Sequence, residues 1–185
     1  GLSVLLSKVK ATPLTEQQFS IVQAFILKIE KEISKWKSEN KPQIKIKEIE
    51  GQEHWFQNNV SEEITFFFFL ISKQTDNDIQ NFLKIVLSSI IVRVSNQDSD
   101  TRFAAIEKNV INGYTLEAFC KKAKEYNSRM AEFSELVHYS TELQVYNADS
   151  RNMDFIKDNS IDIIITSPPY ANTYDYYLYH KFRKR

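Results

Sequence analysis

The sequence is poor in glycine, proline and cysteine: its 185 residues include 3, 4 and 1 of these, respectively. The single cysteine, Cys120, excludes an internal disulfide and suits a reducing cytoplasm. The glycines at positions 1, 51 and 113 are isolated, so the chain has no Gly-x-Gly turn of the kind that lets a backbone approach a nucleotide closely. These residues therefore contain no glycine-rich cofactor loop.

The chain also lacks an excess of either charge, a long apolar run and a secretion signal. Basic and acidic residues number 24 each, so any nucleic-acid binding must come from local patches. The longest apolar run, from Ile64 to Ile71, is too short to cross a bilayer, and the first residues lack a charged-then-apolar pattern. Hydrophobic residues make up 42% of the chain, which is enough for a core. We therefore expect a cytoplasmic protein of about one domain, with no membrane partner.

Apolar residues recur at helical spacing over much of the chain. Thr15 and Gln18 form a capping box ahead of an amphipathic run, which predicts a helix from 15 to about 37. Between residues 61 and 71 an acidic start favours a helix, whereas four consecutive phenylalanines favour a strand by propensity. Further helices are predicted from Ile79 to Val94 and from Thr115 to about Tyr139.

Two polar stretches are candidates for contact with nucleic acid. The first is residues 95–102, predicted to be a loop, and the second is a basic stripe formed by Lys121, Lys122, Lys124 and Arg129 on the last helix. Either could contact phosphates, and either could equally be an ordinary solvated surface.

An isoleucine-rich run from Ile161 to Thr166 ends at the pair Pro168-Pro169. A short, nearly continuous apolar run bounded by turn signals predicts a strand buried on both faces, as in a parallel sheet. Proline cannot donate to a ladder, so the strand must stop there and leave Ser167 at its carboxyl end. In open α/β sheets that position is where ligands bind. Residues 143–147 are predicted as the preceding strand.

The stretch Thr166-Ser167-Pro168-Pro169-Tyr170 resembles the catalytic motif of the amino-methylating DNA methyltransferases. In that family Asp, Asn or Ser precedes Pro-Pro and an aromatic residue, and Ser in first place is most typical of the cytosine-N4 branch. The resemblance implies S-adenosylmethionine as cofactor and double-stranded DNA with a flipped base as partner. The alternative reading of the motif is a strand-ending turn or a polyproline ligand.

The motif's residue types suit methylation of a base amine. The amine lone pair is delocalised into the ring, which makes the amine a poor nucleophile. A hydrogen-bond acceptor on each amine hydrogen would favour a tetrahedral nitrogen and free that lone pair. The Ser167 oxygen and the Pro168 carbonyl are the candidates, with Pro169 fixing the corner before the substrate arrives. Tyr170 would stack on a base swung out of the duplex.

The resemblance assigns further roles around the motif. Asp149 would contact the adenine of the cofactor, although it could equally be the N-cap of a short helix from Arg151 to Ile156. Nucleic-acid contacts are expected from Asn172, Lys181 and Arg183, with core packing of the neighbouring tyrosines as the alternative. No metal site is expected, since His180 has no partners at ligand spacing.

The resemblance also implies an organisation for the whole chain. Residues 1–14 are similar to the helix that follows the second strand in family members, although an ordinary amphipathic helix is the alternative. Residues 15–140 would be a mostly helical insertion, in which the family pattern favours a helix over a strand at 61–71. Residues 141–185 would carry the core strands and the motif. The expected fold is thus α/β, a partial Rossmann-like methyltransferase fold.

We expect a site-specific DNA methyltransferase fragment, truncated at both ends, that acts on cytosine N4 within a restriction-modification system. The main loop for S-adenosylmethionine would lie outside these residues, or on a complementary chain, so the fragment alone would be inactive. Two alternatives remain open: an adenine-N6 DNA or RNA methyltransferase with the same amine chemistry, and a non-enzymatic helical interaction module.

Overall fold

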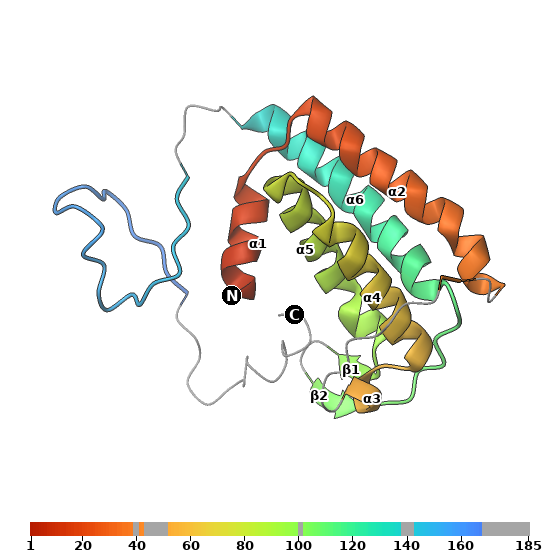
Figure 1. Ribbon diagram of the computed structural model, residues 1–185. Helices are drawn as coiled ribbons and strands as arrows, with labels where there is room; N and C mark the ends of the chain where they lie inside the picture. The colour runs from red at the N-terminus through yellow and green to blue at the C-terminus, as the bar shows by residue number, and fades with distance from the viewer. Residues whose placement is uncertain (39–40, 43–51, 100–101, 138–142, 168–185) are drawn as a thin grey trace.

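The computed structural model describes residues 1–38, 41–42, 52–99, 102–137 and 143–167. These residues form a bundle of helices with a small hairpin at one end and a long extended segment after the last helix (Figure 1). The helices are α1 (Leu2–Ala11), α2 (Glu16–Lys37), α3 (Gln52–Trp55), α4 (Asn58–Ser72), α5 (Asn77–Val94) and α6 (Tyr114–Leu136). The hairpin pairs β1 (Gln97–Ser99) antiparallel with β2 (Arg102–Ala105).

The predicted α/β, partial Rossmann-like fold is wrong for the described residues. Their only sheet is the antiparallel hairpin. Residues 143–147 and 161–166, predicted as strands, lie in no strand, and most of their side chains are exposed. A buried strand must find partners for its backbone donors and acceptors on a neighbouring strand, and no other strand in the described part of the chain lies beside these segments. The isoleucine-rich pattern predicted an apolar environment that the described fold does not provide.

The helices predicted between residues 15 and 139 are confirmed over the described residues, with small shifts at the ends, whereas the short helix predicted from Arg151 to Ile156 does not form. The capping box of α2 is formed: Thr15 Oγ1 accepts from the Gln18 N–H at 3.3 Å, and Gln18 Oε1 accepts from the Thr15 N–H at 2.9 Å. The phenylalanine run lies in α4 and is therefore helical. The predicted loop over 95–102 was partly wrong, because residues 97–99 form β1 and residue 102 begins β2.

The core of the bundle lies between α2, α4, α5 and α6. Helix α6 packs against both α2 and α5, and α4 packs on α5 and α6 (Figure 1). Phe119 of α6 is fully buried, stacks on Phe67 with a centroid distance of 4.2 Å, and lies 6.1 Å from the Phe25 ring. Aromatic rings from three helices therefore meet at the centre of the core. Helix α1 packs mainly on α5, at one side.

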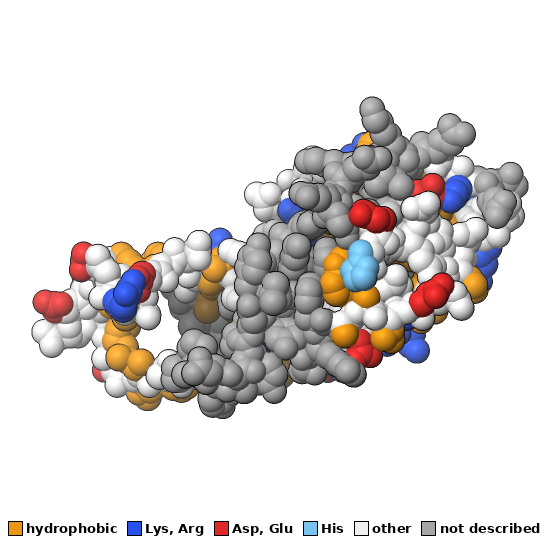
Figure 2. All heavy atoms as spheres, turned by 90° about the horizontal axis from the view of Figure 1, so that it is seen from below, with side chains coloured by type: hydrophobic (Ala, Val, Ile, Leu, Met, Phe, Trp, Pro, Cys, Tyr) orange, Lys and Arg blue, Asp and Glu red, His pale blue; other side chains and the backbone are white. Residues whose placement is uncertain are grey.

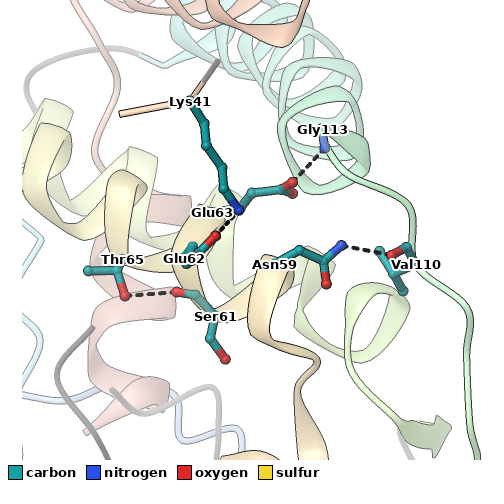
Figure 3. Close-up of polar contacts among 8 residues, drawn as sticks. All are labelled: Lys41, Asn59, Ser61, Glu62, Glu63, Thr65, Val110 and Gly113. Atoms are coloured by element: carbon teal, nitrogen blue, oxygen red, sulfur yellow. Dashed lines mark hydrogen bonds and ion pairs between the residues drawn. The ribbon is translucent and has the colours of Figure 1, made fainter. Parts of the chain in front are cut away.

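The start of α6 is fixed by a carboxylate from another helix. Gly113 precedes α6 with φ +81°, a left-handed conformation that favours glycine, and an added Cβ would lie 2.9 Å from Lys37 Cγ. Glu63 of α4 is fully buried and accepts a hydrogen bond from the N–H group of Gly113 at 2.5 Å (Figure 3) and another from the N–H group of Thr115 at 3.0 Å. The carboxylate thus pairs two of the N–H groups that a helix start leaves without intrahelical partners.

Lysine 108 attaches the hairpin to the bundle. Its ammonium group donates to the carbonyl of Val92 at 2.7 Å, near the end of α5, and to the carbonyl of Gln97 at 2.5 Å in β1. Burial lowers the pKa of Lys108 from its ordinary value. A cation beside the last carbonyls of a helix is also favourable for the helix dipole. The side chain therefore fixes the point at which the chain leaves α5.

Candidate functional site

The candidate site lies on the extended segment of residues 143–167, which follows α6 and extends beyond the helical body (Figure 1). Of the predicted catalytic residues, Ser167 is described, and it is exposed in extended chain. Pro168, Pro169 and Tyr170 lie outside the described residues, as do the predicted nucleic-acid contacts Asn172, Lys181 and Arg183. The proposed chemistry of the motif therefore remains a prediction.

The segment that leads to Ser167 is apolar and exposed. Ile161, Ile163, Ile164 and Ile165 have exposed fractions of 54%, 77%, 78% and 93%. Figure 2 shows apolar side chains on the surface of this part of the molecule, at the left, away from the helical body. A contiguous run of exposed isoleucines is unusual for a folded surface and indicates a contact site.

Asp149 lies in a turn of this segment and is bound by Arg151. Its Oδ1 accepts from the Arg151 backbone N–H at 2.9 Å, and its two carboxylate oxygens accept from the guanidinium group at 2.6 to 3.1 Å. These hydrogen bonds, the side-chain ones most strongly, lower the pKa of the Asp149 carboxyl. The helix predicted after Asp149 does not form, so this residue caps a turn and is no helix N-cap.

The described residues do not by themselves fit S-adenosylmethionine. The predicted adenine contact, Asp149, is exposed, and Arg151 already occupies its carboxylate. No glycine-rich turn accompanies it, because glycine is absent from residues 114–185. Within the described part of the chain, no group of three or more His, Cys, Asp or Glu side chains could hold a metal ion.

The basic stripe predicted on α6 is largely neutralised by neighbouring carboxylates. Lys122 and Arg129 both pair with Glu125, at 2.7 Å and 2.8 Å, and Lys124 pairs with Glu30 of α2 at 2.6 Å. Three of the four basic residues therefore take part in intramolecular ion pairs. The structure favours the solvated-surface interpretation of this stripe over a phosphate-binding one.

A groove beside α1, which the sequence did not predict, lies next to the segment. It comprises two hollows that share Val9, Phe82 and Met130 in their walls, of about 390 Å³ and about 190 Å³. The larger is mainly apolar and lies between α1, α5 and α6. The smaller is lined in part by Leu143 and Val145, so the start of the extended segment closes one end. We call these two hollows the α1 groove. The helical periodicity of residues 2–9 was the available signal, since it predicted an apolar face on α1.

Glu63 is a buried side chain whose role at the start of α6 sequence reasoning missed. Glu62 and Glu63 are adjacent glutamates that look equivalent in the sequence. In the structure Glu62 is half-buried and pairs with Lys41, whereas Glu63 is buried (Figure 3). The available signal was position: Glu63 lies three residues after Val60 and four before Phe67, both fully buried. Its location on the apolar face of α4 predicts burial.

Comparisons with known proteins give no relative for this chain. No protein-family model matches it, and no curated protein or solved structure gives a significant match. In the described residues, no helix combines the length and the apolar character needed to cross a membrane.

Proposed function

We propose that this chain contributes the catalytic corner of an S-adenosylmethionine-dependent methyltransferase that acts on an exocyclic amine of a DNA base. The observation that carries the proposal is the run Ser167-Pro168-Pro169-Tyr170 directly after the isoleucine segment. Support also comes from Ser167, whose exposed position leaves its hydroxyl accessible to a substrate.

In the proposed reaction the chain acts on the amine of the target base. The Ser167 oxygen and the Pro168 carbonyl would each accept a hydrogen bond from one N–H group of the amine, and Tyr170 would stack on the flipped base. Cytosine N4 is the preferred target, because serine opens the motif. Adenine N6, in DNA or RNA, is the alternative within the same chemistry.

We assign cofactor binding to residues other than the described ones, on a complementary chain or elsewhere in the full-length product. This assignment follows from the missing glycine-rich turn and from the engagement of Asp149 by Arg151. The proposed setting is a prokaryotic cytoplasm, with methylation protecting DNA against a cognate restriction enzyme. Duplex contacts would come from Asn172, Lys181 and Arg183.

The test uses the full-length product of the gene with duplex DNA and isotopically labelled S-adenosylmethionine. Digestion of the DNA to nucleosides and mass spectrometry should detect labelled N4-methylcytosine, or N6-methyladenine in the alternative. Ser167→Ala should lower the methylation rate by about a hundredfold or more, as loss of one preorganised polar contact does in other enzymes. Ser160→Ala is the matched control, because Ser160 lies in the same segment and donates within it, to the Lys157 carbonyl at 2.6 Å.

A non-enzymatic helical interaction module is the second candidate, and the helical architecture of the described residues favours it. It predicts that Ser167→Ala and Tyr170→Ala leave every activity of the full-length protein unchanged. Absence of labelled nucleoside, together with full activity of both variants in a binding assay, would replace the first proposal with this one.

A further inference from the structure

The isoleucine segment and the α1 groove are two apolar surfaces of one chain, and neither is covered by the described residues. The larger hollow of the groove is lined mainly by apolar side chains and includes Leu6, with an exposed fraction of 36%. The segment exposes Ile163, Ile164 and Ile165 by 77% or more. Burial of either surface removes apolar area from water and is favourable.

The chain already enters this groove. Leu143 and Val145 line the smaller hollow, on the far side of the shared Val9, Phe82 and Met130. A second apolar segment of the same chain would therefore continue an existing contact along α1. The two hollows adjoin at these shared residues, so the groove continues from the contact of Leu143 and Val145 into the larger hollow.

The charges of the two partners are complementary. Lys8, Lys10 and Arg129 line the groove together with one acidic residue, Asp78, and Arg129 also pairs with Glu125 at 2.8 Å. The segment from 154 to 162 carries Asp154, Asp158 and Asp162 against a single Lys157. An acidic, isoleucine-rich segment and an apolar groove with a mostly basic border are thus complementary in charge.

The connection between the two is long enough. Residues 146–160 separate Val145 in the groove from Ile161. Extended chain covers about 3.3 Å per residue, so this tether spans up to about 50 Å, whereas a helix of the length of α1 measures only about 15 Å. A tether of this length also gives an effective concentration on the order of millimolar, which favours the same chain over a second copy.

We propose that residues 161–165 dock into the α1 groove of the same chain, with Asp162 beside Lys10. Docking places Ser167 at the edge of the helical body, so that the helices and the motif-bearing segment act as one unit. The inference goes beyond the proposed function and does not depend on it, because docking requires no methyl transfer.

Disulfide trapping tests the docking. Leu6→Cys with Ile163→Cys should cross-link within one chain about tenfold faster than Leu27→Cys with Ile163→Cys, because docking holds residue 163 beside Leu6, whereas the tether alone brings it to either position only transiently. Leu27 is a matched control: it is an exposed leucine of another helix, α2, with an exposed fraction of 47%. Burial raises the pKa of the native Cys120 to about 12, which keeps this thiol from competing at neutral pH.

The charge pairing has its own test. Lys10→Glu and Asp162→Lys should each slow the Leu6–Ile163 cross-link, and the two substitutions together should restore it. Equal rates for the Leu6 and Leu27 pairs would overturn the proposal. A cross-link that forms mainly between two chains, and faster at higher protein concentration, would overturn it in favour of a second copy as occupant.

Hydrogen exchange gives an independent measurement without new cysteines. In the Ile163→Asp, Ile165→Asp variant the amides of α1 should exchange faster than in the parent protein, whereas those of α2 should not change. Circular dichroism checks that the helical content is retained. Unchanged exchange in α1 would contradict docking, and neither measurement involves methylation.

Discussion

Individual polar residues decide how the helices are joined. Glu63 is the clearest case, since its carboxylate is fully buried and satisfies two N–H groups at the start of α6. Burial raises the pKa of Glu63 above its ordinary value of 4.5, and the hydrogen bonds from Gly113 and Thr115 oppose that shift. The residue therefore joins α4 to α6 at an electrostatic cost.

Glu63→Ala should lower the free energy of unfolding by about 2 kcal/mol, because it leaves buried N–H groups without partners. Chemical denaturation measures the loss. Glu62→Ala is the matched control: its side chain is partly exposed and pairs with Lys41, so the expected loss is about 1 kcal/mol or less. Equal losses in the two variants would contradict the role assigned to Glu63.

The pH dependence of Glu63 has a definite sign. Because the folded state raises the pKa of this carboxyl, the native protein holds its proton more tightly than the unfolded chain does. The corresponding stabilisation is present below pH 4.5 and is lost as pH rises through the folded-state pKa. Relative to Glu63→Gln, the parent protein should therefore lose stability over that window, and parallel urea titrations across it would detect the difference.

At the scale of elements, the helix starts are where the sequence is most informative. Asp76 is the N-cap of α5: its Oδ1 accepts from the N–H groups of Asp78 at 2.8 Å and Ile79 at 3.0 Å. Gln18, near the start of α2, donates to Asp76 Oδ2 at 2.9 Å. One side chain thus caps a helix and links it to another.

Asp76→Ala should cost about 1 kcal/mol of stability at neutral pH, as the loss of a helix cap typically does. Hydrogen bonds, chiefly from the Ile79 N–H, lower the pKa of Asp76 below 3.8, so its contribution is present above that value and is lost as pH falls through the folded-state pKa. Thermal unfolding of parent and variant at several pH values measures both effects.

Asp78→Ala is the control, because Asp78 lies in the same first turn but is exposed. It should cost a few tenths of a kcal/mol through the helix dipole. If Asp76→Ala lowered the stability by the same amount in acid as at neutral pH, the capping role of the Asp76 carboxylate would be contradicted.

The predicted strands show how an element can fail although its local pattern is strong. Residues 161–165 have the composition of a buried strand, yet the described structure leaves them without regular secondary structure, and the isoleucines among them are exposed. A helix satisfies its own backbone, whereas a strand depends on a neighbour that its own sequence does not specify. The helices α2, α5 and α6 could therefore be predicted from local patterns, whereas the local pattern at α4 left helix and strand open and the predicted strands did not form.

At the scale of the whole molecule, one aromatic centre holds the bundle together. Phe119 contacts Phe67 of α4 and Phe25 of α2, and all three side chains are buried. Phe119→Ala should lower the free energy of unfolding by about 3 to 5 kcal/mol, since it leaves a cavity where three helices meet. Denaturant unfolding followed by circular dichroism measures this loss.

Phe69→Ala is the matched control at the surface, because the Phe69 side chain has an exposed fraction of 51%. Its expected effect is within about 0.5 kcal/mol, as for most surface substitutions. A comparable loss in both variants would show that the core does not centre on Phe119.

The sequence by itself determined the helices, the capping box of α2 and the motif that ends at Tyr170, because each depends on residues within a few positions of one another. Only the tertiary structure decided that Glu63 caps α6 and that α1 borders a groove. It also decided that the isoleucine segment lies outside any sheet. These features depend on which distant residues meet, and local periodicity carries no information about such contacts.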